Sequence, residues 1–564
     1  MKIQKKKYRL GDILVQQGVI TPDQLERALE AQKKSHKRLG DYLVENGITT
    51  DENIANALHV QLGIPKIDLR GMKIPQDMIR LVPGSVLRKH SVLPVGFDKN
   101  NSNLLLLAMA DPLDMSAQDD IAIITNCLVE PVISTRGEIN SILDKYFGAD
   151  EAMSAVEQYA KERGTQQEEN TPREEEELST APIVQLVRSI IEQAVRQRAS
   201  DIHIDALESQ VRVRYRIDGV LVEKMLYDIS LLPAIVTRIK ILSGMDISER
   251  RKPQDGRMTM TVDRVEYDIR VSILPSSYGE KTVMRLAAAN SMACDKSKLG
   301  LHDWEMDKFD RILSHPYGIL LVTGPTGSGK STTLYTALSE LNTEAVNIIT
   351  VEDPVEVNIP GVNQVQVNPK AELTFASALR SILRQDPDII MIGEIRDFET
   401  ASIAVQASIT GHLVVSTLHT NSAAATITRL INMGVESYLL SDSLVGIIAQ
   451  RLVRRLCTAC RKARPATPDE KRFLGIPEEK EITLYDACGC PLCGGTGYYG
   501  RIGVYEIMEI TSKLRHVISM KGTTEEIRET ALSEGMHTLR MNAIEYVLEG
   551  ITTIPEILKI TFEE

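Results

Sequence analysis

Hydrophobic and polar residues follow several different periods along this chain, and each period predicts a different kind of element. Near the start, two stretches of helical spacing are each interrupted by a glycine, which predicts two helix-turn-helix units with Leu25 and Leu29 facing inward. Further on, PIVQLVRSIIEQAVRQRA has the spacing of an amphipathic helix, whereas VRVRYRIDG and DRVEYDIRVSILP alternate as strands do. The apolar runs VLPVGF and LLLLAMA suggest a further small α/β unit that ends near residue 148.

Length and composition indicate several domains. A chain of 564 residues with 43% hydrophobic content can bury several cores, and residues 150–180 are polar, acidic and aperiodic, as mobile linkers are. We expect a multidomain α/β protein that consists of a tandem-repeat domain at 1–65, a small α/β part at 66–149, the acidic flexible linker at 150–180, a small α/β domain at 181–295, a nucleotide-binding domain at 296–450 and a C-terminal subdomain at 451–564.

The charge balance and the lack of long apolar runs indicate which partners and which cellular location to expect. Lys+Arg 65 against Asp+Glu 77 gives a formal net charge of −12, which disfavours nonspecific attraction to nucleic acid, so no nucleic-acid partner is expected. The start MKIQKKKYRLGD lacks the apolar core of a signal peptide, and no segment approaches about 20 consecutive apolar residues. A cytoplasmic protein is therefore predicted.

A glycine-rich loop lies between an apolar run and a helical run near the middle of the chain. The strand pattern of residues 318–322 leads into GPTGSGKST, and TTLYTALSEL follows as a helix. Glycines let backbone amides surround phosphate oxygens, Lys330 can reach the β and γ phosphates, and the Ser331 hydroxyl can ligate Mg²⁺. The predicted ATP-binding residues are Gly324, Pro325, Thr326, Gly327, Ser328, Gly329, Lys330, Ser331 and Thr332.

Carboxylates and imidazoles occur in three further β-rich blocks, VNIITVEDPVE, DIIMIGEIRD and TGHLVVSTLHT. In an open α/β sheet, ligands bind at the carboxyl ends of strands, so groups that follow these runs could converge on the γ-phosphate and its attacking water. Each carboxylate taken singly could instead cap a helix or form a surface salt bridge. We expect Glu352 to polarise water and Glu394 to support Mg²⁺ and its waters, although the two could exchange roles. The histidines expected at this site are His412 and His419.

Four of the seven cysteines form two CxxC pairs separated by 29 residues. Zn²⁺ accepts four thiolates tetrahedrally in this arrangement, which predicts a structural zinc site in the C-terminal subdomain; the alternative is four reduced thiols. Cys488 is an alternative ligand beside the second pair, whereas Cys127 and Cys294 are isolated and expected to be buried. The predicted zinc ligands are Cys457, Cys460, Cys490 and Cys493.

Twenty-four residues near the start of the chain occur twice. Residues 9–32 match residues 38–61 at an offset of 29, which indicates a duplication. The second helix of the first copy opens with a capping-box pattern at Thr21 and Gln24. The leucines are expected in the core, Gly11 and Gly40 allow a close approach, and Arg and Gln are the polar groups available to a twofold ligand.

The blocks GPTGSGKS, TVEDPVE, IIMIGEIRD and TGHLVVSTLHT resemble the Walker A, Asp box, Walker B and His box of the type II secretion and type IV pilus ATPase family. The resemblance covers residues 181–564. It implies a RecA-like ATPase domain preceded by a PAS-like α/β domain, a ring of six subunits, and an inner-membrane platform protein as partner. It also implies that Arg270 and Arg285 sense the phosphates, with Arg257 as a weaker candidate; the alternative for each is a salt bridge within the small domain.

The repeat, with its five-residue spacer, resembles the tandem cyclic di-GMP motif found at the start of some pilus-extension and MshE-type secretion ATPases. Ile54, in place of the usual leucine, is a mild departure from that motif. The alternative is a helical docking module that binds only a membrane-protein partner. By the resemblance, the residues lining cyclic di-GMP would be Arg9, Leu10, Gly11, Leu14, Gly18 and Gln32 with Arg38, Leu39, Gly40, Leu43, Gly47 and Gln61.

Together these features favour a hexameric ATPase, docked peripherally on the inner face of the cytoplasmic membrane, that assembles pilin into a type IV pilus under control of cyclic di-GMP. A type II secretion ATPase that builds a pseudopilus is the alternative within the same family. A nucleic-acid translocase with a similar core is disfavoured by the acidic balance. A nonhydrolysing nucleotide-dependent switch is a third possibility, for which Glu352→Gln would leave turnover unchanged.

Overall fold

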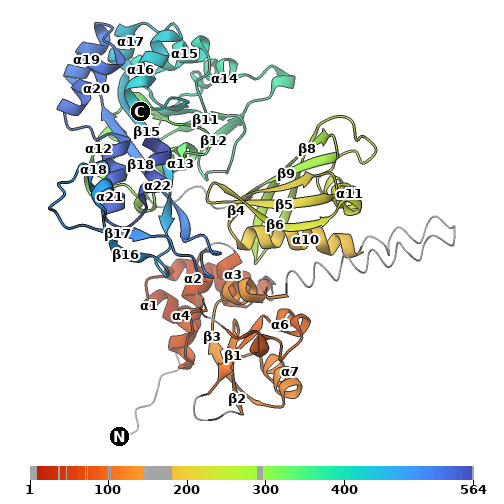
Figure 1. Cartoon of the computed structure of the whole chain (residues 1–564). Helices are drawn as coiled ribbons and strands as arrows, with labels where there is room; N and C mark the ends of the chain where they lie inside the picture. Colours follow the sequence, from red (N-terminus) through yellow and green to blue (C-terminus); the bar gives the residue numbers. More distant parts are fainter. Residues whose placement is uncertain are drawn as a thin grey trace. The chain divides into compact units, whose positions relative to one another are not determined.

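The computed structural model describes residues 9–35, 38–45, 48–69, 72, 74–98, 101, 103–143, 146–147, 181–288 and 296–561. The chain divides into two compact units, Met1–Ala289 and Asn290–Glu564, which are described separately below (Figure 1). The expected linker at 150–180 and the features expected at Gly47 and Cys294 lie outside the described residues. Among the described residues, no helix is both long and apolar enough to cross a membrane.

Four helices form the N-terminal repeat, two from each copy, as the helical spacing predicted. Leu14 and Leu43 occupy equivalent positions in the two copies, and both are fully buried in the core between the helices. The expectation that Leu29 faces inward is wrong: this residue is 41% exposed, because its neighbour Ala28 occupies the core-facing position. The helices are α1 (Leu10–Gln16), α2 (Pro22–Ser35), α3 (Leu39–Glu45) and α4 (Asp51–Leu62).

A small α/β region follows the repeat. Its three strands have the order β1-β2-β3, with β2 antiparallel to β1 and parallel to β3, and a core of its own lies between the sheet and the helices. The two apolar runs noted in the sequence are β1 and β2. The elements are α5 (Gln76–Ile79), α6 (Gly84–His90), β1 (Val92–Phe97), β2 (Leu104–Met109), α7 (Met115–Thr125) and β3 (Leu128–Ile133).

Residues 181–288 form a six-stranded antiparallel sheet in the order β6-β5-β4-β9-β8-β7. Alternate strand residues, such as Ile202 and Ile204, are buried in one core with the apolar residues of α10 and α11, so the other face of the sheet carries polar side chains. The elements are α10 (Ala181–Arg196), β4 (Ala199–Ala206), β5 (Gln210–Ile217), β6 (Val220–Asp228), η1 (Ile229–Leu231), α11 (Leu232–Leu242), β7 (Gln254–Val262), β8 (Val265–Ser276) and β9 (Gly279–Ala288).

The second unit contains a seven-stranded sheet in the order β12-β11-β13-β14-β10-β15-β18. Figure 1 labels β11, β12, β15 and β18 of this sheet. Its paired strands are parallel except for β18, which is antiparallel to β15. The elements of residues 296–443 are η2 (Lys296–Lys298), α12 (Asp303–Leu313), β10 (Gly318–Thr323), α13 (Lys330–Leu341), β11 (Ile348–Glu352), β12 (Asn363–Gln366), η3 (Pro369–Ala371), α14 (Phe375–Ile382), β13 (Ile389–Ile392), α15 (Phe398–Ile409), β14 (Leu413–Leu418), α16 (Ala423–Asn432) and α17 (Ser437–Ser443).

The C-terminal part shares this sheet and its core. The expected division at residue 450 falls inside β15, and one hydrophobic cluster runs from Ile319 of β10 to Ile560 of the last helix. A separate two-stranded sheet, β16-β17, lies near the cysteines. The elements are β15 (Leu444–Leu456), β16 (Lys462–Pro465), α18 (Pro468–Phe473), β17 (Thr483–Asp486), β18 (Tyr498–Glu509), α19 (Ser512–Ser519), α20 (Thr524–Ser533), α21 (Leu539–Leu548) and α22 (Ile554–Thr561).

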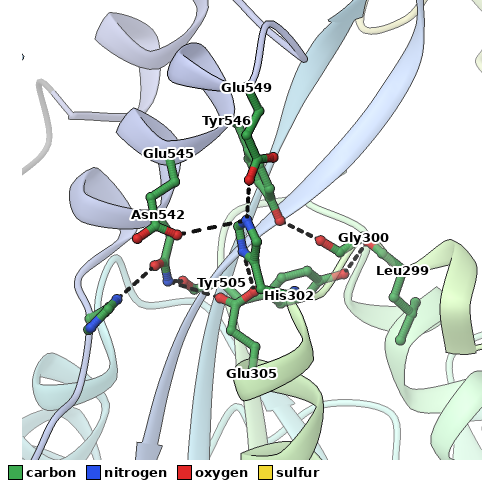
Figure 2. Close-up of polar contacts among 10 residues, drawn as sticks. Leu299, Gly300, His302, Glu305, Tyr505, Asn542, Glu545, Tyr546 and Glu549 are labelled. Carbon is green, nitrogen blue, oxygen red and sulfur yellow. Dashed lines mark hydrogen bonds and ion pairs between the residues drawn. The ribbon is translucent and has the colours of Figure 1, made fainter.

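A polar cluster ties the start of this unit to helix α21 (Figure 2). Glu305 of α12 is fully buried, and its carboxylate accepts hydrogen bonds from the His302 backbone N–H and from Asn542 Nδ2, each at 2.9 Å. The Asn542 amide also donates to the Tyr505 carbonyl at 2.7 Å. Burial raises the pKa of Glu305 above its ordinary value, although the contacts with His302 partly oppose that rise. The cluster therefore joins α12, β18 and α21 through one buried carboxylate.

Candidate ATP site and cysteine centre

The glycine-rich loop has the structure that phosphate binding requires. It connects β10 to the amino terminus of α13, where free backbone N–H groups and the helix dipole favour an anion. Gly327 and Gly329 have φ values of +79° and +91°, which an L residue rarely adopts. The buried Ser328 hydroxyl has no hydrogen-bond partner among the described residues. The loop therefore has the backbone shape of a phosphate-binding site, and the Ser328 hydroxyl lacks a hydrogen-bond partner among the described residues, as expected when no phosphate is bound.

Lys330 is the first residue of α13 and lies folded over the loop. Its Nζ donates hydrogen bonds to the carbonyls of Gly324 at 2.8 Å and Pro325 at 3.0 Å. Burial lowers the pKa of Lys330 from 10.5 to about 8; the nearby Glu394 opposes this and Arg451 adds to it. A phosphate would replace the two carbonyls as the partner of the ammonium group and would favour its charged form.

Glu394 and His419 follow neighbouring parallel strands, as the sequence predicted. Glu394 comes two residues after β13 and His419 directly after β14, and His419 Nε2 lies 3.2 Å from Glu394 Oε2. Arg396 donates a hydrogen bond to the other carboxylate oxygen. Burial alone would raise the pKa of Glu394, but Arg396 and His419 together hold it below its ordinary value. This carboxylate is therefore ionised and is close enough to Lys330 to influence its pKa.

Glu352 is the last residue of β11 and is 3% exposed. One carboxylate oxygen accepts hydrogen bonds from Thr350 Oγ1 at 2.6 Å and Gln364 Nε2 at 3.0 Å. The other accepts a hydrogen bond from the hydroxyl of Tyr335, which lies on α13. The carboxylate is therefore held in one orientation by donors from three different segments.

His412 does not join this group. It precedes β14, and the next residue, Leu413, pairs with Gly318 at the start of β10. Because β10 and β14 are parallel, His412 lies at the amino end of the strands, whereas the phosphate loop follows the carboxyl end. The expectation that both histidines follow a strand is wrong for His412, since the strand lies between them. Its ring Nδ1 is 2.9 Å from the carbonyl of Ala407 instead.

The arginines of the small domain lie in one row across its sheet. Strand register pairs Arg257 with Arg270, Arg270 with Arg285, and Arg285 with Asp201, so their side chains share a face. Arg285 Nε is 3.3 Å from Asp201 Oδ1, and Arg270 Nε is 3.7 Å from Asp268 Oδ2. Both predicted phosphate sensors thus form ion pairs within the small domain, while the Arg285 side chain stays 62% exposed.

The four predicted zinc ligands gather at one point. Their Sγ atoms all lie within 4.8 Å of one another, with Cys457 and Cys490 at 3.7 Å and Cys460 and Cys493 at 3.9 Å. Four thiolates about 2.3 Å from a tetrahedral zinc ion would be about 3.8 Å apart, so the spacing fits zinc. Cys488 is outside this group, since its side chain is exposed and directed to the Asp486 carbonyl.

Gly11 and Gly40 of the N-terminal repeat leave room for side chains of neighbouring helices. A Cβ on Gly11 would lie 2.5 Å from Leu25 Cδ1, and a Cβ on Gly40 would lie 3.3 Å from Ile54 Cγ2. The two copies are thus packed alike, and the looser fit at Gly40 coincides with the isoleucine that departs from the motif. Gly11 and Gly40 serve helix packing in this structure, and so do the buried leucines.

The polar residues of the repeat have a different placement. Arg9 and Gln61 are exposed, and Gln32 is half-buried. The Arg38 side chain is 68% exposed and forms an ion pair with Asp111 of the small α/β region. Arg38, Gly40 and Asp111 line one hollow together with residues of both regions. Among the described residues of the second copy, Arg38 and Gly40 thus lie at this concave surface.

Several residues of the ATP site carry no sequence signal of their own. Tyr335, Gln364 and Arg396 contact the two carboxylates, and Arg451 lies beside the phosphate loop and donates a hydrogen bond to Asn421. Arg396 lies two residues after Glu394 and could have been suspected from that spacing. The others come from separate strands, helices and loops, and their role depends on the order of strands in the sheet.

Comparisons with known proteins show which family the chain resembles. Residues 176–559 match the family described as "Type II/IV secretion system protein", and residues 62–153 match the "MshEN domain". The chain is 43% identical over 562 residues to the "Type IV pilus assembly ATPase PilB" of Myxococcus xanthus, with 98% of each chain covered. It is 44% identical over 508 residues to the "Type II secretion system protein E" of Xanthomonas campestris pv. campestris, with 89% of each covered. The solved ATPase DotB of Legionella pneumophila shares the fold, with a TM-score of 0.50 at 22% identity over 67% of this chain and 95% of DotB.

Proposed function

This chain belongs to the type II/IV secretion system protein family, and we propose how its ATP hydrolysis is used. It is an ATPase of the class that drives pilus assembly or protein secretion. We infer that six copies form a ring, and that the ring assembles pilin into a type IV pilus through an inner-membrane platform protein. The match to a type IV pilus assembly ATPase along 98% of both chains carries this choice.

Glu352, Glu394 and the phosphate loop account for hydrolysis. The loop and Lys330 bind the β and γ phosphates, and Ser331 and Glu394 would hold Mg²⁺, which neutralises phosphate charge. We assign the polarisation of the attacking water to Glu352, because three donors already fix its carboxylate in one orientation. Glu352→Gln should then lower kcat by about 100-fold or more, since the amide cannot accept a proton. An unchanged kcat would indicate that Glu394 has this role.

Arg270 and Arg285 are the groups proposed to neutralise the transferred phosphoryl charge. Their guanidinium groups lie in one row on the polar face of the small domain, and that of Arg285 is exposed. To reach phosphate, each would have to exchange its carboxylate partner for a phosphate oxygen, which offers a similar bidentate geometry. Replacement of either arginine by glutamine should therefore lower kcat more than it weakens ADP binding.

Cyclic di-GMP is the proposed regulator. The tandem repeat presents arginine and glutamine in both copies, and the adjacent residues 62–153 match the MshEN domain. The test is a calorimetric titration of cyclic di-GMP into the full chain and into a variant with Arg9→Ala and Arg38→Ala. Micromolar or tighter binding that the variant loses would support the proposal. Equal binding by both proteins, or no binding, would contradict it.

Type II secretion is the other use of such an ATPase. The sequence identity to a type II secretion protein is 44% over 508 residues, compared with 43% over 562 residues for the pilus assembly ATPase. Complementation separates the two. The gene would be expressed in Myxococcus xanthus that lacks its pilus assembly ATPase, and in Xanthomonas campestris that lacks its secretion protein E. Restoration of surface pili alone would support pilus assembly, whereas restoration of secretion alone would support the alternative.

A further inference from the structure

Residues 419–422 form the loop between β14 and α16. This loop contacts Thr323, which precedes the phosphate loop, and the carboxylate of Glu394. His419, its first residue, lies 3.2 Å from Glu394 as described above. The backbone N–H of Thr420 donates to Thr323 Oγ1 at 3.0 Å, and Thr323 is the last residue of β10 before the phosphate loop. The position of the His419 ring relative to the phosphate loop thus depends on how these few residues are held.

Arg451 of β15 holds the same loop from the other side. The residue is only 5% exposed, and its Nη2 donates to the Asn421 carbonyl at 3.2 Å and to Asn421 Oδ1 at 3.1 Å. Its Nη1 donates to the Gln450 carbonyl at 3.1 Å. Two terminal nitrogens of one planar guanidinium group therefore donate hydrogen bonds in fixed directions, Nη2 to the His419 loop and Nη1 to its own strand.

The same guanidinium packs against the phosphate loop. Because β15 is the parallel neighbour of β10, with Thr323 paired to Ala449, the next residues of β15 lie under the loop. A Cβ on Gly324 would be 2.5 Å from the Gln450 carbonyl and 3.2 Å from Arg451 Nη1. Gln450 also accepts a hydrogen bond from Thr333 of α13 at 2.9 Å. Residues 450 and 451 thus contact both ends of the phosphate cradle.

We propose that Arg451 is a positioning residue for ATP hydrolysis. Its guanidinium group binds Asn421 and thereby keeps the His419 ring at a fixed position relative to the phosphate loop and Glu394. The inference rests on the role proposed above for Glu394, whose carboxylate His419 contacts. Positioning of this kind is sensitive to small displacements, because a shift of about 1 Å in a catalytic group can cost about 100-fold in rate. Loss of this positioning should lower kcat indirectly, because Arg451 contacts neither the attacking water nor Glu352, which is proposed to polarise that water.

Three variants test this proposal. Arg451→Lys keeps the positive charge but loses the planar fork, and Asn421→Ala removes the side-chain acceptor at an exposed position. Each should lower kcat about tenfold, while ATP KM and the affinity for a fluorescent ADP stay within about threefold of the unmodified protein. The double variant should fall no further than Arg451→Lys alone, because Asn421→Ala removes an acceptor whose guanidinium donor is already lost in Arg451→Lys. Arg455→Gln, at an exposed position of the same strand, is the matched control and should keep full activity.

Each other result would overturn the proposal. An unchanged kcat in Arg451→Lys would mean that charge alone matters, and an unchanged kcat in Asn421→Ala would remove the link to the His419 loop. A double variant slowed about 100-fold would show two independent effects. A loss of ADP affinity equal to the loss of kcat would mean a distorted phosphate loop, and melting temperatures identify any variant that fails to fold. Absence of ATP hydrolysis by the unmodified protein would instead contradict the proposed function.

Discussion

The Tyr335 hydroxyl donates a hydrogen bond to the Glu352 carboxylate, and both residues are buried. Tyr335 lies on α13, five residues after Lys330, whereas Glu352 ends a different strand. The helix that receives the phosphates at its amino terminus therefore also orients the carboxylate proposed to polarise water. Burial, with Glu352 as a further cause, raises the pKa of Tyr335, so the phenol remains a donor.

Tyr335→Phe should lower kcat about three- to tenfold and leave ADP affinity unchanged, because the carboxylate loses one of three donors while the phosphate loop stays intact. The same change should lower the free energy of unfolding by about 2 kcal/mol, as expected for a lost hydrogen bond to a charged group. Steady-state hydrolysis and urea unfolding measure the two effects. Tyr438→Phe, at an exposed position, is the control. Full activity in Tyr335→Phe would argue against Glu352 as the polarising group.

ADP binding should weaken as pH rises above about 8. The pKa of Lys330 is lowered to about 8 in the nucleotide-free protein, so its amine loses a proton above that pH, whereas bound phosphate favours the charged form. Binding at higher pH must then take up a proton, which costs at most about tenfold in affinity per pH unit. Calorimetry in buffers of different ionisation enthalpy detects the uptake. An affinity that stays constant from about pH 7.5 to about pH 9.5 would contradict the prediction, and Lys330→Arg should abolish the dependence.

The cysteine cluster should hold one zinc ion per chain. Metal analysis of the purified protein tests the stoichiometry, and removal of zinc by a chelator should lower the melting temperature, because structural zinc contributes about 10 kcal/mol or more to folding small domains. Cys460→Ser should lose the metal, whereas Cys488→Ser should keep it, since Cys488 lies outside the cluster. Equal zinc content in these two variants would contradict the assigned ligands.

Asn542→Ala should lower the free energy of unfolding by about 3 kcal/mol. The change deprives both the buried Glu305 carboxylate and the Tyr505 carbonyl of a donor, and each unsatisfied group costs about 1–3 kcal/mol. Chemical denaturation gives the value, and Met541→Ala, one residue away on an exposed position of the same helix, is the control. Equal stability of the two variants would show that the cluster of Figure 2 does not hold α21 in place.

Features that depend on short-range patterns could be predicted from the sequence. The capping box at Thr21 and Gln24 forms with reciprocal hydrogen bonds of 2.8 and 3.2 Å, and the phosphate loop lies between its predicted strand and helix. The four cysteines meet as their CxxC spacing predicted. In each case the residues are close in sequence, or their chemistry admits few other arrangements, so spacing alone carries the information.

Which distant residues meet could be seen only in the folded chain. The strands that build the ATP site have the spatial order β11-β13-β14-β10-β15, which differs from their order in the chain, so Arg451 comes to lie beside Gly324 and Asn421. Strand direction likewise separates His412 from His419 although both flank one apolar run. Such contacts depend on how the strands pair across the whole sheet. Hydrophobic periodicity predicts which residues are buried, but it does not predict which residues lie next to them.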